Sequence, residues 1–379
     1  MRKYILMAVL ILILFNVDCL KSEKSINENW PMFRHDVQHS GVTSENLEPP
    51  LKLKWSFKTG DRVYSSPAVY NGIVYVGSWD SYIYALDAKS GELIWKFKTG
   101  DRVYSSPAVY NGIVYVGSWD SYIYALDAKS GELIWKYGTG VPLYYSSPSP
   151  REGIVYVGAL DGCLYALDAK SGELIWKSKT NSRVKSSPAI YNDIVYVGSD
   201  DNYLYALDAK SGELIWKFRT LGDVESSPAI YNDIVYVGSD DNYLYALDAK
   251  SGELIWKYET RDDVKSSPAV YDGIVYVGSW DNHVYALDAN TGKLKWEYET
   301  GGRIYSSPVV SRGKGYFKSG VVYIGSDDHY LYALDAKSGQ LKWKFKTNGR
   351  LFSSPAISNG SLFIGTTELE GNNTLAFYK

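Results

Sequence analysis

The eleven residues ALDAKSGELIW, from Ala85 to Trp95, recur unchanged from Ala125 to Trp135 and with small changes down the rest of the chain. The repeat is longer than this stretch, because the forty residues Phe57–Lys96 are identical to Phe97–Lys136. A fixed period of about 40 residues is typical of repeat architectures. The number of repeats therefore decides the fold, and two markers in the sequence count them.

Both markers occur once in each unit. The motif SSP appears eight times, beginning at Ser65, Ser105, Ser146, Ser186, Ser226, Ser266, Ser306 and Ser353. A tryptophan also takes the same repeat position eight times, as Trp55, Trp95, Trp135, Trp176, Trp216, Trp256, Trp296 and Trp343. The chain therefore contains eight units.

Each unit contains four short strand signals and no useful helical period. In the first unit these signals are Pro67–Tyr70, Ile73–Ser78, Tyr82–Asp87 and Glu92–Lys98, and the pair Asn71-Gly72 favours a type I′ turn. The strands are apolar on both faces, so each sheet has to be covered on both sides. Four-stranded units of this length predict an all-β, eight-bladed β-propeller of antiparallel blades.

The two ends of the chain predict how the ring closes. The last unit, from Ser353, has no docking tryptophan of its own, and Trp55 has no unit before it. We expect the N-terminal strand Leu51–Lys58 to complete the last blade, which leaves no bare edge between first and last blades. The propeller would span residues 51–379, preceded by a lead-in segment at residues 23–50.

The opening stretch is interpreted as a brace between blades. Asp87 can accept hydrogen bonds from backbone donors in the next turn, and Gly91 gives that turn a permissive backbone. Trp95 is expected to lie flat against a neighbouring blade, where the small Ala85 leaves room. A second recurrent aspartate, Asp80 in the first unit, is also predicted to be structural.

The first residues resemble a signal peptide, with Arg2 and Lys3 before the apolar run Ile5–Phe15. We assign residues 1–22 to this signal, with an uncertain cleavage site, and predict a secreted or cell-envelope protein. Membrane association would then require lipidation at Cys19 or an uncleaved anchor at residues 4–17. Once Cys19 is removed, Cys163 is the only thiol, so no internal disulfide framework is possible.

The charged residues exclude several classes of function. The net charge is −3, and no basic excess suggests nucleic acid. The four histidines form no metal or triad pattern, and the aspartate doublets match no calcium loop. We therefore predict no metal site, and we expect a monomer.

The braces resemble a known family. ALDAKSGELIW is similar to the tryptophan-docking motif of pyrroloquinoline quinone (PQQ)-type propellers, and WPMFRHDVQHSGV from Trp30 resembles their N-terminal lead-in. The resemblance spans residues 30–379 and implies an eight-bladed propeller. The superfamily includes quinoprotein alcohol dehydrogenases and non-enzymatic propellers, such as the envelope lipoprotein that assists outer-membrane protein assembly.

The sequence favours the non-enzymatic branch. The resemblance implies that the dehydrogenases hold Ca²⁺ with Glu, Asn and Asp side chains, use an Asp as base and often carry adjacent cysteines. This chain has no adjacent cysteines, and its units lack the long insertions that build such sites. We predict no catalytic residue and no cofactor, with a PQQ-dependent dehydrogenase as an alternative.

Function is expected where the repeats differ, on the face that carries the loops entering each first strand. Before the SSP motif, Tyr64, Tyr104, Tyr145, Tyr305 and Phe352 form an aromatic arc over consecutive units, and Lys185, Glu225 and Lys265 form a charged arc. We predict a scaffold that binds a protein or peptide segment there. The candidate ligand-binding residues are Arg62, Tyr64, Trp79, Arg102, Tyr104, Trp119, Trp280, Arg303, Tyr305 and Arg350. The alternative is a carbohydrate-binding propeller that uses Trp79, Trp119 and Trp280 as stacking platforms.

Overall fold

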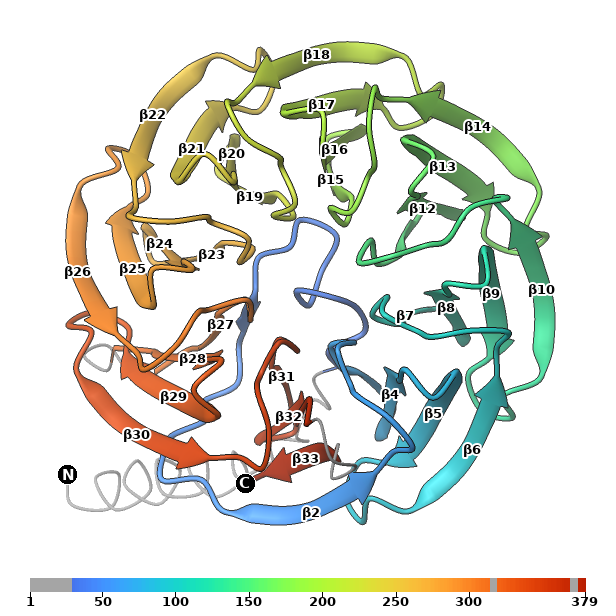
Figure 1. The fold of residues 1–379 in the computed structure, drawn as a ribbon, viewed down its shortest axis with the longest axis horizontal. Helices are drawn as coiled ribbons and strands as arrows, with labels where there is room; N and C mark the ends of the chain where they lie inside the picture. The colour runs from blue at the N-terminus through green and yellow to red at the C-terminus, as the bar shows by residue number, and fades with distance from the viewer. Residues whose placement is uncertain (1–28, 314–318, 369–373) are drawn as a thin grey trace, which may run out of the picture.

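The computed structural model describes residues 29–313, 319–368 and 374–379 (Figure 1). The predicted signal peptide, including Cys19, lies outside these ranges. Within them, no helix is both long and apolar enough to cross a bilayer. Cys163 is a free, buried thiol, as expected of a small apolar residue.

The prediction of an eight-bladed propeller is confirmed. Eight antiparallel sheets surround a central axis, and each places its shortest strand innermost (Figure 1). Blades 1 to 4 consist of β3 (Ala68–Tyr70), β4 (Ile73–Gly77), β5 (Tyr82–Asp87) and β6 (Leu93–Lys98); β7 (Ala108–Tyr110), β8 (Ile113–Gly117), β9 (Tyr122–Asp127) and β10 (Leu133–Gly138); β11 (Ser149–Arg151), β12 (Ile154–Gly158), β13 (Cys163–Asp168) and β14 (Leu174–Lys179); and β15 (Ala189–Tyr191), β16 (Ile194–Ser199), β17 (Tyr203–Asp208) and β18 (Leu214–Arg219).

The second half of the ring repeats this order. Blades 5 to 7 consist of β19 (Ala229–Tyr231), β20 (Ile234–Gly238), β21 (Tyr243–Asp248) and β22 (Leu254–Glu259); β23 (Ala269–Tyr271), β24 (Ile274–Gly278), β25 (His283–Asp288) and β26 (Leu294–Glu299); and β27 (Val309–Ser311), β28 (Val321–Gly325), β29 (Tyr330–Asp335) and β30 (Leu341–Lys346). Blade 8 consists of β31 (Ala356–Ser358), β32 (Ser361–Gly365), β33 (Thr374–Tyr378) and β2 (Leu53–Lys58), and β1 (Val42–Thr43) adds a parallel strand to blade 7.

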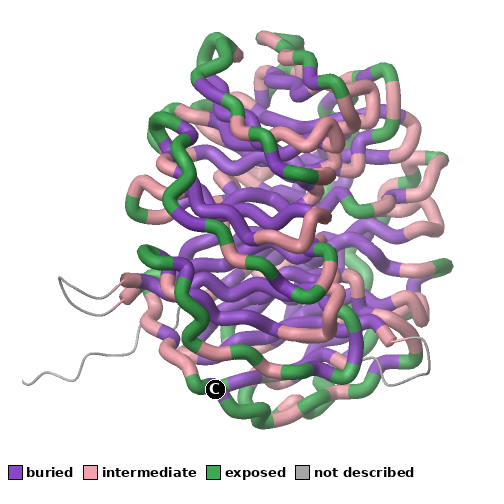
Figure 2. Tube along the Cα trace, turned by 60° about the vertical axis from the view of Figure 1, so that its left-hand side comes forward, coloured by how far each residue is buried: buried purple, intermediate pink, exposed green. Residues whose placement is uncertain are grey.

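The hairpins follow the chemistry of their turn residues. Asn71 and Gly72 both have positive φ, at 50° and 77°, as a type I′ turn requires. The strands are buried on both faces except at the outer strand of each blade (Figure 2). Most apolar residues are therefore covered by the next blade, and the core is divided into layers between blades.

Both ends of the chain close the ring, as predicted. β2 pairs antiparallel with β33, and the backbone N–H and C=O groups of Lys52 and Lys379 bond each other at 3.0 Å. A second closure lies near the axis, where the second serine of each SSP accepts the N–H of its counterpart one blade earlier, at 2.9–3.1 Å. The last of these bonds, from Ser354 N to Ser66 Oγ, joins blade 8 to blade 1 and completes a ring of eight.

The braces work as predicted, with one correction. The Trp95 indole Nε1 donates to the carbonyl of Ala128 in the next blade at 3.1 Å, and the Tyr75 hydroxyl donates to the same oxygen at 2.9 Å. The expectation that Ala85 makes room for Trp95 was wrong, because Ala85 is its ladder partner within the blade. The room comes from Gly131 of the next blade, where a Cβ would lie 2.6 Å from the indole.

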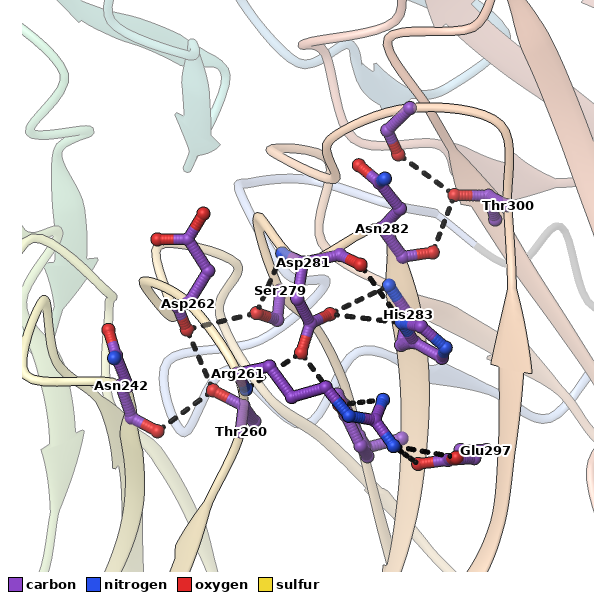
Figure 3. Close-up of polar contacts among 12 residues, drawn as sticks. Asn242, Thr260, Arg261, Asp262, Ser279, Asp281, Asn282, His283, Glu297 and Thr300 are labelled. Atoms are coloured by element: carbon purple, nitrogen blue, oxygen red, sulfur yellow. Dashed lines mark hydrogen bonds and ion pairs between the residues drawn. The ribbon is translucent and has the colours of Figure 1, made fainter.

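The recurrent aspartates are structural, as predicted. In the turn of blade 1, Asp87 Oδ1 accepts the N–H groups of Lys89 and Ser90 at 3.0 and 2.7 Å. In blade 6, Asp281 ties the hairpin between the second and third strands to the preceding blade (Figure 3). Its carboxylate accepts the backbone N–H of Arg261 at 2.9 Å and the Tyr285 hydroxyl at 2.6 Å.

The lead-in segment closes one end of the central channel. It crosses the middle of the ring (Figure 1), where six inner strands donate a backbone N–H to its carbonyl groups at 2.6–3.2 Å. Arg34 is 2% exposed and donates to the carbonyls of Pro268 and Pro308, and His39 contacts the carbonyl of Pro228 at 3.0 Å. The propeller is therefore a cup rather than a tunnel.

Candidate functional site

The cup is a cavity of about 310 Å³ on the propeller axis. Phe33 of the lead-in lines it together with the ring of eight serines. Its walls come from the residue that precedes each SSP motif, which the blade architecture places around one mouth. The predicted aromatic and charged arcs are brought together here: Tyr64, Tyr104, Tyr145, Tyr305 and Phe352 face Lys185, Glu225 and Lys265.

The aromatic arc is a continuous set of ring contacts across blades 7, 8, 1, 2 and 3. Phe352 lies 4.5 Å from Tyr305 and 5.0 Å from Tyr64 between ring centroids, and Tyr64 lies 5.6 Å from Tyr104. Tyr104 is only 5% exposed, so it serves mainly to pack the arc. Tyr145 is exposed, and Tyr64, Tyr305 and Phe352 are partly exposed, so these four rings face the cavity.

The charged arc is a chain of alternating ions. Lys185 Nζ lies 2.8 Å from Asp200 and 2.6 Å from Glu225, and Lys265 Nζ lies 3.1 Å from Glu225 and 2.6 Å from Asp240. These side chains are only 7–17% exposed, so their ion pairs are screened much less than surface pairs. Asp200 and Asp240 lie behind the wall. Both belong to the aspartate doublets of the sequence, which did not predict an ion pair with these lysines.

Burial and charge act differently on these carboxyl groups. Burial raises the pKa of Asp240 to about 7, because its one close ammonium partner does not fully offset the lost solvation. Burial also opposes ionisation of Glu225, but hydrogen bonds and charge from Lys185 and Lys265 lower the pKa of Glu225 below its usual value. Glu225 is therefore the fixed negative charge at the centre of the wall.

The three predicted tryptophans lie on this face but have crowded surroundings. Tyr64 stacks on Trp79 at 4.6 Å, and the guanidinium groups of Arg62 and Arg102 lie 5.1 and 4.7 Å from the ring centre. Trp119 and Trp280 are likewise approached by cations, which attract the faces of aromatic rings. All three indole rings therefore have cationic neighbours, and Trp79 also has a stacked tyrosine ring.

A second cleft, of about 380 Å³, adjoins the cup between blades 7, 8 and 1. Tyr64 and Phe352 line both spaces. The other residues that line the cleft are Arg62, His329, Arg350, Thr367 and Glu368. Sequence analysis named the two arginines as candidates but not His329 or Glu368. His329 occupies the hairpin position that is Ser81 in the first unit, and this position was not compared around the ring.

Almost all of the propeller sequence matches the model of a known repeat family. Four overlapping stretches, 52–151, 120–225, 205–313 and 299–378, match the repeat family described as outer membrane protein assembly factor BamB. The chain belongs to this family. No curated protein sequence matches the chain.

Solved structures of proteins with different names and activities have the same fold as this chain. BamB from Moraxella catarrhalis aligns with a TM-score of 0.73 at 19% identity, covering 87% of this chain and 99% of that one. Quinohemoprotein alcohol dehydrogenase ADHIIG from Pseudomonas putida HK5 gives 0.80 at 16% identity, covering 93% and 80%. The computationally designed Ika8 protein gives 0.72 at 18% identity, covering 89% and 100%. At these identities the likeness is one of fold alone.

The cup does not fit the quinone cofactor that the fold family implies. Among the described residues, carboxylate oxygens of Asp200, Asp223 and Glu225 converge within 4.8 Å, as a metal site requires. The Lys185 ammonium group already lies against Asp200 and Glu225, so a divalent cation there would be repelled. Arg62 and Arg350, which could hold the three carboxylates of PQQ, line the cleft between blades 7, 8 and 1, whereas these acids belong to blades 4 and 5.

Proposed function

We propose that this protein is an exported, non-enzymatic scaffold of the cell envelope, acting as a monomer that holds a segment of a partner protein in its cup. The observation that carries the proposal is the cup itself. It has one mouth, a partly exposed aromatic arc and a fixed ionic wall, and the lead-in closes its other end. Partly exposed aromatic rings at the centre of a concave surface are the usual anchors of protein recognition.

Membership of the BamB family supports a role in the envelope. The apolar run after Arg2 and Lys3 supports export across the membrane by a signal peptide, with removal of residues 1–22. The propeller begins beyond this segment and depends on none of it for its closure. A lipid on Cys19 would tether the scaffold to a membrane without changing the cup.

The two alternative functions draw less support from the site. A quinone-dependent dehydrogenase needs a metal site, and Lys185 occupies the convergent carboxylates that would form one. A carbohydrate platform needs open indole faces, and Trp79 has Tyr64 and two guanidinium groups against its ring. Tyr305 and Phe352 are also partly exposed, and both line the cup.

Photo-crosslinking in intact cells tests the proposal. p-Benzoylphenylalanine would replace Tyr305 or Phe352 in the cup, and Tyr191 or Tyr231 on the opposite face would serve as matched control sites. We expect one discrete crosslinked partner from both cup positions and none from the controls. Equal crosslinking at all four positions, or none at the cup, would overturn the proposed function.

A further inference from the structure

Charge on the cup face is divided between its two halves. One repeat position, two residues before the aromatic arc, carries arginine on the consecutive blades 7, 8, 1 and 2, as Arg303, Arg350, Arg62 and Arg102. The same position carries Asp223 and Asp263 on blades 5 and 6. Arg183 takes this position on blade 4, so the anionic side is limited to blades 5 and 6 and lies opposite a cationic side on blades 7, 8, 1 and 2.

The cleft between blades 7, 8 and 1 lies at the centre of the cationic side. The Arg62 guanidinium lies 5.1 Å from the centre of the Trp79 ring, and this contact helps to hold it in place. Arg350 is 53% exposed and has only a loose pair with Asp327, at 3.7 Å. Such an exposed pair contributes little, so the guanidinium remains free to bind a stronger acceptor.

The cleft and the cup form one binding surface. They share Tyr64 and Phe352 as a common wall, so a ligand can place one group on each side of these rings. Arg62 and Arg350 line the cleft with one carboxylate, Glu368. A second carboxylate, Asp327, approaches Arg350 only to 3.7 Å, so the two guanidinium groups can still take an anion. The cup side offers aromatic rings and favours an apolar or aromatic group.

We propose that Arg62 and Arg350 form an anion site that takes the side-chain carboxylate of an acidic residue in the partner segment, while an aromatic residue nearby in that segment enters the cup. The inference rests on the proposed function, since it names the chemistry of the segment that the cup holds. The acidic side at Asp223 and Asp263 fixes the direction of the segment by repelling its acidic end.

Synthetic peptides test the pairing of these two groups. Acetylated and amidated peptides would carry one glutamate and one phenylalanine separated by one to three glycines, with matched versions containing glutamine or lysine in place of glutamate. Isothermal titration of the full chain measures their affinities at low and at physiological salt. At the best spacing, we expect the glutamate peptide to bind at least tenfold more tightly than the glutamine peptide, and the lysine peptide most weakly.

Variants of the chain locate the site. Arg62→Gln with Arg350→Gln should abolish the preference for glutamate, while Arg183→Gln, at the same repeat position on blade 4, should keep it. Replacing the phenylalanine of the peptide by glycine should cost at least tenfold in affinity. Equal affinity of the glutamate and glutamine peptides, or no binding by either, would overturn the inference. If the cup positions still crosslink a partner in cells, the proposed function stands while the acidic segment does not.

Discussion

At the residue scale, the brace depends on a glycine that receives the indole from the preceding blade. Gly131 has φ of 74° and lies against Trp95, whereas Gly112 in the same blade has φ of 76° and no heavy atom within 4 Å of a built Cβ. The two glycines share the same backbone requirement and differ only in the contact. They therefore separate the energy of docking from that of the turn.

We predict that Gly112→Ala costs about 1 kcal/mol of unfolding free energy through backbone strain alone. Gly131→Ala should cost about 1–3 kcal/mol more, because the added methyl group has to displace the indole. Urea unfolding followed by tryptophan fluorescence measures both. Equal midpoints for the two variants would show that the indole is not held by this glycine.

A second residue-scale prediction concerns pH. The pKa of Asp240, raised by burial to about 7, exceeds its value of about 3.9 in an unfolded chain. The folded state then keeps a proton that the unfolded state loses, so wild-type stability falls as pH rises from about 4 to about 7. Relative to Asp240→Asn, we expect the unfolding free energy of the wild type to decline across that window and to stay level above it.

Asp335 provides a control of opposite sign. Burial opposes its ionisation, but hydrogen bonds from Ser319 and Ser338 and the approach of Lys342 lower the pKa of Asp335 to about 2. Its contribution is present above about pH 4 and is lost as pH falls towards 2. Against Asp335→Asn, the wild type should therefore lose stability only in acid. If the difference in unfolding free energy between the wild type and each variant did not change with pH, these pKa assignments would be contradicted.

At the scale of single elements, strand β2 and the lead-in have separable roles. β2 supplies the outer strand of blade 8, and the lead-in covers the end of the channel with Trp30, which is 1% exposed. Chains that begin at residue 29, 51 or 59 would keep both, keep only β2, or lose both. Each start falls outside a strand of the ring.

We predict that starting at residue 51 lowers the unfolding free energy by at least about 3 kcal/mol, the cost of removing one buried tryptophan. Starting at residue 59 also leaves β33 with an unpaired edge, so that chain should aggregate or fail to fold. Thermal unfolding and size-exclusion chromatography distinguish the three. A chain from residue 59 as stable as that from residue 51 would show that β2 does not close the ring.

Contacts made by side chains that recur in every repeat can be predicted from the sequence, whereas contacts made by backbone groups or between blades cannot. Blade number, turn type and the role of Asp281 follow from residues that recur at fixed positions, so one unit explains most of the others. The closing of the channel does not follow, because the lead-in binds through its own carbonyl groups to the inner strands. The pairing of Lys265 with Asp240 also escapes prediction, since it depends on how neighbouring blades meet.

At the scale of the whole molecule, the identity of Phe57–Lys96 and Phe97–Lys136 allows a clean test of blade number. Deleting one copy removes a blade without creating any new sequence junction. The serine ring and the lead-in are fitted to eight inner strands, so we expect a lower melting temperature and self-association on size-exclusion chromatography. A compact monomer with unchanged melting temperature would show that the ring does not require eight blades.

The architecture of the whole ring also explains why the candidate binding residues lie at one end of the axis. Repetition makes the blades interchangeable, and the lead-in breaks that symmetry by closing one end of the axis. In the described part of the chain, the open end brings residues from all eight blades to one cavity. Tyr64, Lys185, Glu225 and their counterparts differ from blade to blade, and around this cavity they form an aromatic side and a charged side.

The affinity of the scaffold for the partner captured by crosslinking tests this account most directly. Tyr305→Ala with Phe352→Ala would be compared with Tyr191→Ala and Tyr231→Ala on the opposite face, with melting temperatures measured alongside. We predict that the cup variant loses at least tenfold in affinity at a melting temperature close to that of its control, which binds like the wild type. Unchanged binding by the cup variant, or an equal loss in the control, would contradict the claim that the cup holds the partner.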